Sequence, residues 1–286
     1  MGCAGLLCGC YSLLKSVQKM NPNQFSANAA LMCSLRVLLM QCLIFLSACN
    51  QPSAPSNASV APPDIRVDGK VIYFFGLLDP EVTKAVAPYI VSGKYKTLRI
   101  TSPGGEVLSA MDFGALVYEY GLDVTVDKEC QSSCANYIFP AGKNKTIESG
   151  SLIVWHGDAR QRDFLEKLKT LDSKAKAIGM NKMSSVDKSE LKHFQHMIEK
   201  QDVFYKKIGI DGSIARIGQE IDLPVHQWAM PAETMAAFGI FNIDAPPDYG
   251  TKEYCQRWVA ARNSSKVNCL NLTIQEIQAW RIRPTR

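Results

Sequence analysis

The sequence predicts an α/β fold in which most strands pair in parallel. Segments rich in β-branched and aromatic residues alternate with segments of helical periodicity, as in sheets whose strands are joined by helices. The alternation begins with a strand at 71–75, a helix at 81–91 and a strand at 97–101, which stops abruptly at Ser102-Pro103-Gly104-Gly105. The 286 residues, 47% of them hydrophobic, suffice for one large domain or two small ones.

The alternation continues with a helix at 107–121, a strand at 123–127, a helix opening at 133–139 and a strand at 151–155. Residues 158–209 depart from it, because two apolar stripes there have helical spacing. Ser184-Ser185-Val186-Asp187 resembles a capping box at the start of the second stripe. We therefore expect an inserted helical hairpin, which either packs on the parent domain or mediates self-association.

Charge and hydropathy exclude two classes of protein. The net charge is +5, but residues 1–48 hold three basic residues and no acidic one, which leaves 29 basic against 27 acidic residues. We therefore expect no nucleic-acid partner. No apolar run reaches the roughly 20 residues of a spanning helix, which excludes a polytopic membrane protein.

The first 48 residues have the features of a secretory leader. Arg36 precedes the apolar run 37–46, and small residues follow. Leu46-Ser47-Ala48-Cys49 resembles the bacterial lipobox, which implies a lipid anchor on Cys49 in the bacterial periplasm; Asn50 would favour the outer membrane. Met20 or Met32 would give a more usual leader, so translation could start there. Residues 49–68 read as a flexible tether.

After cleavage, and with Cys49 lipidated, four cysteines remain, an even number in an oxidising compartment. Proximity in the chain predicts the pairs Cys130–Cys134 and Cys255–Cys269. The second would close a C-terminal tail at 251–286. A redox role for the first pair is disfavoured, because its spacing is not the C-x-x-C of thioredoxin-like proteins.

Three short segments could carry chemistry together. The paired glycines of Ser102-Pro103-Gly104-Gly105 allow a backbone N–H to approach a ligand, and Ser133 opens a predicted helix, where N–H groups are unpaired. His156 ends an apolar strand and could activate a hydroxyl. Taken singly, the three are an ordinary loop, an N-cap and a core histidine.

Taken together, these segments resemble the proteolytic subunit of the Clp protease, ClpP, within the ClpP/crotonase superfamily. The resemblance runs from Leu98 to His156: after the Ser-Pro-Gly-Gly break, Ser133 is followed nine residues later by Gly142, and then by a strand that ends in His156. The segments Met230-Pro231-Ala232-Glu233 and Phe238-Gly239-Ile240 resemble the closing part of ClpP. The segment Cys130-Gln131-Ser132-Ser133-Cys134-Ala135 is most similar to periplasmic ClpP-like proteins.

The resemblance implies a ClpP/crotonase-like core of repeated β-β-α units at 69–250, with the hairpin at 158–209 inserted. It implies a serine peptidase with Ser133 as nucleophile, His156 as base and Asp222 as orienting carboxylate. The N–H groups of Gly105 and Cys134 would hold the oxyanion. It further implies a peptide or protein substrate, a homo-oligomer, and no cofactor or metal.

Four alternatives stay open at this stage. The scaffold could bind a peptide or acyl group without catalysis, or a lysine could replace the histidine as base. His226 could compete with His156 for Asp222. His193 and His196, three residues apart on a helix, could bind a metal, but no third ligand of suitable spacing accompanies them.

Overall fold

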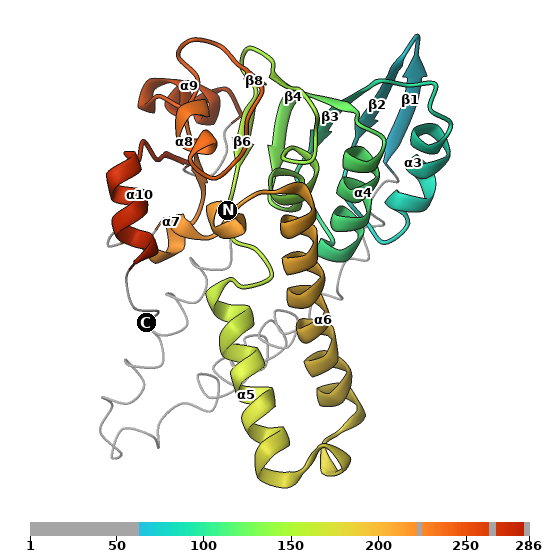
Figure 1. Ribbon diagram of the computed structural model, residues 1–286, viewed down its shortest axis with the longest axis vertical. Helices are drawn as coiled ribbons and strands as arrows, with labels where there is room; N and C mark the ends of the chain where they lie inside the picture. The colour runs from blue at the N-terminus through green and yellow to red at the C-terminus, as the bar shows by residue number, and fades with distance from the viewer. Residues whose placement is uncertain (1–62, 222–224, 263–266, 283–286) are drawn as a thin grey trace, which may run out of the picture. The chain divides into compact units, whose positions relative to one another are not determined.

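The computed structural model describes residues 63–221, 225–262 and 267–282, which form a mixed α/β fold around a largely parallel sheet (Figure 1). The order in this seven-stranded sheet is β1-β2-β3-β4-β5-β8, and β6 pairs with β4 as well. β1 is antiparallel to β2, and every other pair is parallel. The strands are β1 (Asp64–Asp68), β2 (Val71–Phe75), β3 (Thr97–Ser102), β4 (Asp123–Gln131), β5 (Lys145–Ile147), β6 (Leu152–Val154) and β8 (Ile243–Asp244).

Helices follow most strands, and a second, two-stranded sheet pairs β7 (Trp228–Ala229) with β9 (Asn268–Cys269). The α-helices are α3 (Val82–Val91), α4 (Val107–Glu119), α5 (Arg162–Ile178), α6 (Ser185–Ile208), α7 (Ile217–Glu220), α8 (Ala232–Ala236), α9 (Lys252–Arg262) and α10 (Ile274–Arg281). Shorter helical turns are η2 (Cys134–Ile138), η3 (Met180–Lys182) and η4 (Gly212–Ala215). One apolar core unites the sheet with α3, α4 and η2; the edge-to-face rings of Phe74 and Phe113 lie within it.

Most of the predicted strands and helices are present, and the differences concern short or polar strands. β1 begins at Asp64, inside the range 49–68 expected to be a tether, so the folded part starts earlier than predicted. Its sequence, Asp-Ile-Arg-Val-Asp, is that of an edge strand whose side chains are mostly exposed. The rest of the tether, the leader and Cys49 lie outside the described residues.

β4 is longer than the predicted strand at 123–127, because it bends rather than ends. Lys128 has a φ of +71°, and the register against β3 shifts between Ile100 and Ser102. Before the bend β4 pairs with β5, and after it with β6. Such irregularities are common beside functional sites, and this one brings Cys130 between β3 and β6.

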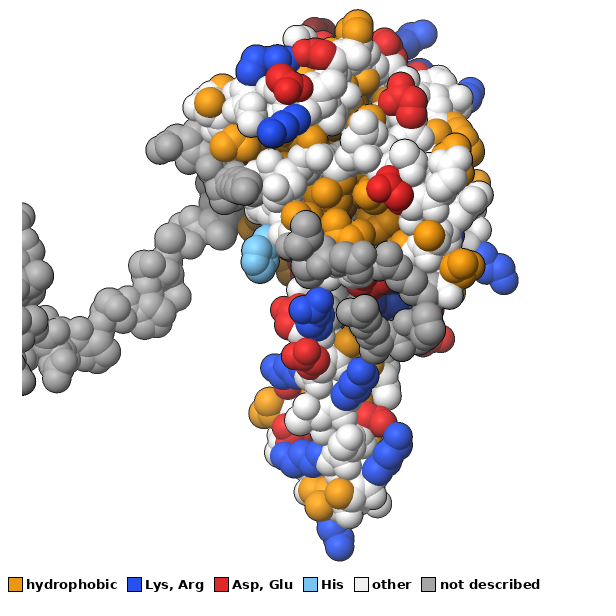
Figure 2. Space-filling view, turned by 90° about the vertical axis from the view of Figure 1, so that its left-hand side faces the viewer, with side chains coloured by type: hydrophobic (Ala, Val, Ile, Leu, Met, Phe, Trp, Pro, Cys, Tyr) orange, Lys and Arg blue, Asp and Glu red, His pale blue; other side chains and the backbone are white. Residues whose placement is uncertain are grey.

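Helices α5 and α6 form an antiparallel pair within the predicted range 158–209. Ser184 caps α6 by accepting from Asp187 N–H, and Gly209, in the left-handed region, ends it. Ion pairs Lys167–Glu190 and Lys174–Asp187 join the helices over a small apolar cluster. In Figure 2 both signs of charge are interspersed along the pair.

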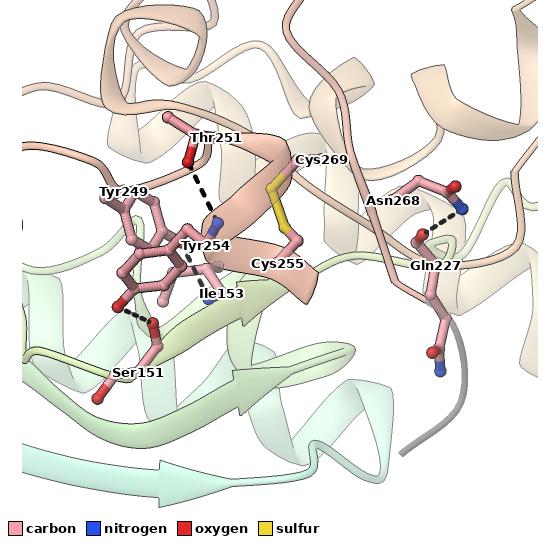
Figure 3. Close-up of a disulfide and its surroundings, with 9 residues drawn as sticks. All are labelled: Ser151, Ile153, Gln227, Tyr249, Thr251, Tyr254, Cys255, Asn268 and Cys269. Carbon is pink, nitrogen blue, oxygen red and sulfur yellow. Dashed lines mark hydrogen bonds between the residues drawn. A yellow bond between two sulfur atoms is a disulfide. The ribbon is translucent and has the colours of Figure 1, made fainter. Parts of the chain in front are cut away.

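The C-terminal segment packs on β6 and on the residue before it. Tyr249 accepts from the Ile153 N–H, and Tyr254 donates to the Ser151 carbonyl (Figure 3). The disulfide Cys255–Cys269 joins α9 to β9, as predicted. Among the residues that the structure describes, no helix is both long and apolar enough to span a bilayer.

Candidate active site

The three segments singled out in the sequence meet at one edge of the sheet. Strands β3, β4 and β6 are neighbours and run in parallel, so their carboxyl ends lie together. The Ser-Pro-Gly-Gly break follows β3, the paired serines follow β4, and His156 follows β6. Ligands of parallel α/β sheets bind at this edge.

The side chain that reaches the histidine is that of Ser132. Its Oγ lies 2.7 Å from Nε2 of His156, within hydrogen-bond distance. Both residues are half-buried, so a ligand can reach them. A hydroxyl held against an imidazole is the minimal arrangement of an activated serine nucleophile.

Ser133 has a different place from the one expected. It is only 2% exposed, and its Oγ donates to the carbonyl of Gly105 over 2.8 Å. The structure therefore brings together Ser132 and His156 and leaves Ser133 buried in the neighbouring loop. The sequence prediction chose Ser133 by family spacing, whereas the serine in contact with His156 is its neighbour, Ser132.

The reason lies in the turn formed by residues 131–134, here called the Ser132 turn. Ser132 has a φ of +54°, in the left-handed region that side chains other than glycine rarely adopt. Such a conformation costs about 1–3 kcal/mol and persists only where its surroundings hold it. Ser132 N–H donates to the Val154 carbonyl, and its own carbonyl accepts from Asn136 N–H. The reversal turns Ser132 outward and Ser133 inward.

Two N–H groups of the residues around Ser132 make no hydrogen bond within the described part of the protein. Within the described ranges, the N–H groups of Gly105 and Ser133 donate to no protein acceptor. The N–H after the nucleophile and one from a glycine loop are the usual donors of an oxyanion hole. The N–H that directly follows Ser132 is that of Ser133, whereas the prediction named Cys134 together with Gly105.

The two glycines are required by close backbone contacts. A Cβ on Gly104 (φ +93°) would lie 2.6 Å from the Cβ of Ser132 and 2.5 Å from the Gln131 carbonyl oxygen. A Cβ on Gly105 would lie 2.2 Å from the Leu78 carbonyl oxygen. A side chain at Gly104 would therefore displace the Ser132 turn, and one at Gly105 would disrupt the parallel β-bridge that joins Gly105 to Leu78.

Glu106 fixes the loop to α4, a role that the sequence did not reveal. Its carboxylate accepts from the N–H groups of Leu108 and Ser109 and so caps α4. Burial alone would raise the pKa of Glu106, but the hydrogen bonds from Leu108 and Ser109, with a smaller contribution from His193, together leave the pKa below its ordinary value. The charged side chain thereby anchors the residue next to Gly105.

A buried polar network lies directly after His156. The fully buried Asp158 accepts from Arg160 N–H and from Gln201 Nε2, with Arg216 3.6 Å away. Gln201 Oε1 accepts in turn from the Tyr137 hydroxyl. Burial raises the pKa of Asp158, and Arg216 offsets only part of that effect. The signal in the sequence was weak, because a single Asp two residues after a His has no distinctive spacing.

The third member of the expected triad cannot be placed, since Asp222 lies outside the described residues. Gln219 Nε2 donates to the main-chain carbonyl of His156 over 2.6 Å and fixes the backbone there. His226, the alternative partner, is exposed.

A lysine base is not supported by the buried lysine of this sheet. Lys145 lies on β5 and donates to the Phe241 carbonyl. It is paired with Val124 of β4, and Val124 precedes Ser132 by eight residues. Burial lowers the pKa of Lys145 to about 8. At about 3.3 Å per strand residue, Lys145 lies far from the hydroxyl. His193 and His196 are exposed, and the described residues hold no group of three potential metal ligands.

Both predicted disulfides are present. Cys130 and Cys134 are bonded across the Ser132 turn, with 5.2 Å between their Cα atoms, and both side chains are fully buried. Cys130 belongs to β4 and Cys134 opens η2.

Comparisons with known proteins give a likeness among solved structures. No family model matches the sequence, and no curated protein matches it. Among solved structures, a ClpP1 point mutant from Listeria monocytogenes is similar over 63% of this chain and 94% of its own, with a TM-score of 0.40 and 15% sequence identity.

Proposed function

We propose that the protein is a serine hydrolase, a peptidase of the ClpP-like type, with Ser132 as nucleophile and His156 as general base. The observation that carries the proposal is the 2.7 Å contact between Ser132 Oγ and His156 Nε2. The N–H of the following residue, Ser133, has no acceptor among the described residues. The left-handed φ of Ser132 supports the proposal, because backbone strain of this kind clusters at active sites.

The same geometry gives a mechanism. His156 Nε2 takes the proton of the Ser132 hydroxyl as Oγ attacks the carbonyl carbon of a peptide bond. The oxyanion accepts from the N–H groups of Ser133 and Gly105, each worth about 2.7–4 kcal/mol of barrier in comparable sites. The imidazolium returns its proton to the leaving amine, and water, activated by His156, hydrolyses the acyl-enzyme. Asp222 is our candidate for the carboxylate at Nδ1.

We extend the proposal to the architecture. The core at 69–250 is a ClpP/crotonase-like superhelix of repeated β-β-α units, and α5 with α6 is an insertion into it. Support comes from the sequence motifs, from the parallel sheet and from the position of the two helices between β6 and β7.

Our proposals for the location and the partners of the protein are based on the sequence alone. We propose a periplasmic protein anchored by lipid at Cys49, acting on peptides or proteins and able to form homo-oligomers. Metabolic labelling with a fatty-acid analogue tests the anchor: wild type should carry the label, and Cys49→Ser should not.

Labelling with a fluorophosphonate probe tests the catalytic proposal. Wild type should react, Ser132→Ala should lose labelling to background, and the matched control Ser133→Ala should retain most of it. Equal labelling of wild type and Ser132→Ala would reject the nucleophile. No labelling of any form, together with saturable peptide binding, would favour a non-catalytic binding module.

A further inference from the structure

The disulfide Cys130–Cys134 spans the residues that the proposed chemistry uses. Only Gln131, Ser132 and Ser133 lie between its ends. Of these, Ser132 would supply the nucleophile and Ser133 an oxyanion donor. The bond therefore joins the strand before the site to the helical turn after it.

One end of the bond is fixed by the sheet. Cys130 is paired with Ser102 of β3 on one side and with Ile153 of β6 on the other. It lies two residues beyond the bend of β4 at Lys128, and its side chain is fully buried. Movement of Cys130 would require two strand pairings to break.

The other end of the bond lies at the start of η2, which follows the Ser132 turn directly. Cys134 is the first residue of η2, and its carbonyl accepts from Phe139 N–H. Ser133, the N-cap of η2, makes no side-chain capping bond, because its hydroxyl donates to Gly105 instead. The covalent bond thus supplies a fixed start to η2 where the usual cap is missing.

Two hydrogen bonds of the Ser132 backbone hold the turn besides the disulfide, one to Val154 and one from Asn136. These bonds must offset the cost of the left-handed φ of Ser132, because a serine is more stable at negative φ. Relaxation would carry the hydroxyl away from His156 and re-aim the Ser133 N–H.

The two disulfides of the chain differ in what they could stabilise. A cross-link constrains the unfolded chain more when it closes a longer loop. Cys255–Cys269 closes a separation of 14 residues and Cys130–Cys134 one of only 4. The disulfide that closes the shorter loop should therefore add less to the stability of the whole fold, but it restricts the backbone of the three residues between its ends directly. Cys255–Cys269 lies in the C-terminal segment (Figure 3) and contains no residue of the site.

We propose that Cys130–Cys134 is a positioning element of the active site, which holds Ser132 in the left-handed conformation that brings its hydroxyl to His156. This inference rests on the proposed function for its kinetic consequence, but the contact that it explains can be measured without catalysis.

The kinetic test compares the two disulfides. The rate of fluorophosphonate labelling and the melting temperature are measured for wild type, Cys130→Ala/Cys134→Ala and Cys255→Ala/Cys269→Ala. We expect Cys130→Ala/Cys134→Ala to slow labelling about 10²-fold, the effect of a misplaced reacting group. Cys255→Ala/Cys269→Ala should lower the melting temperature, and below that temperature it should still be labelled. Unchanged labelling of Cys130→Ala/Cys134→Ala would overturn the proposal.

A second measurement does not depend on activity. The chain has four histidines, so the ¹⁵N spectrum of its imidazoles is simple to assign with a His156→Gln variant. Removing Cys130–Cys134 should shift the Nε2 resonance of His156 as Ser132→Ala does, because both abolish the same hydrogen bond. An unchanged resonance would overturn the positioning role even if wild type fails to label, whereas a shifted resonance with no labelling would refute only the hydrolase.

Should the double alanine variant not fold, the Cys255→Ala/Cys269→Ala variant reduced with dithiothreitol leaves the side chains of Cys130 and Cys134 in place without their bond. The same resonance and the same labelling rate then decide the question.

Discussion

The Ser132 turn and the α5–α6 pair differ in how far their residues follow local conformational preferences. The helical pair satisfies local rules throughout: a capping serine begins α6, a glycine ends it, and exposed ion pairs link the helices. The turn violates a local rule, since it holds a serine at a φ of +54° among buried neighbours. The difference indicates where function is to be sought, because strain of this kind persists where the surrounding structure enforces it.

The largest expected effect concerns the contact on which the turn depends. His156→Gln keeps a polar side chain but removes the base, so the rate of fluorophosphonate labelling should fall about 10⁴-fold or more. The matched control is His226→Gln, at an exposed position. Comparable losses in both variants would show that the contact with Ser132 has no special role.

Gly104→Ala should have the next largest effect, because its Cβ would meet Ser132 and Gln131 well inside contact distance. A displacement of the Ser132 turn by about 1 Å is expected to reduce labelling about 10²-fold. Gly93→Ala is the control: Gly93 has a φ of +67° but nothing within 4 Å of the added Cβ. Equal loss of activity in both variants would attribute the effect to backbone strain alone.

A smaller effect, on stability, is expected from the network behind His156. Because the pKa of Asp158 is raised in the folded protein, folding takes up a proton above the ordinary Asp pKa of about 3.9. The free energy of unfolding should therefore fall as pH rises from about 4 towards the raised value, by at most about 1.4 kcal/mol per pH unit.

Urea unfolding across this pH range measures that slope, which Asp158→Asn should remove. Asp172→Asn, at the surface of α5 beside Lys176, should leave it in place. A slope that survives in Asp158→Asn would assign the proton uptake to another group.

The smallest effect is expected in the helical pair. The Lys174–Asp187 ion pair is exposed to solvent, so Lys174→Ala should leave the midpoint of urea unfolding almost unchanged. Labelling should be unchanged. A clear loss of labelling would mean that the helical pair communicates with the site and would weaken the contrast drawn above.

The same difference explains which parts of the structure could be predicted from the sequence. Periodicity and caps predicted α5 and α6 and most of the sheet, since those elements follow local preferences. The short strands β1 and β5 were missed because they are too polar or too brief to show a period. The three segments predicted to lie together do so, but which of the two serines contacts His156 was not predictable, because the conformation of Ser132 depends on contacts with β6 and η2 that no local pattern encodes.

The site also depends on residues with no sequence signal at all. Asp158 and Gln201 act through a hydrogen bond between segments far apart in the chain, and Glu106 acts through a local cap on α4. Burial decides their chemistry, and burial follows from tertiary packing rather than from spacing.

Peptide mapping of the fluorophosphonate adduct tests the central claim most directly. Trypsin releases residues 129–143 as one peptide after Lys128, and this peptide contains both serines. Fragmentation should place the phosphonyl group on Ser132. An adduct on Ser133, or none on this peptide in a protein that is labelled, would contradict the account.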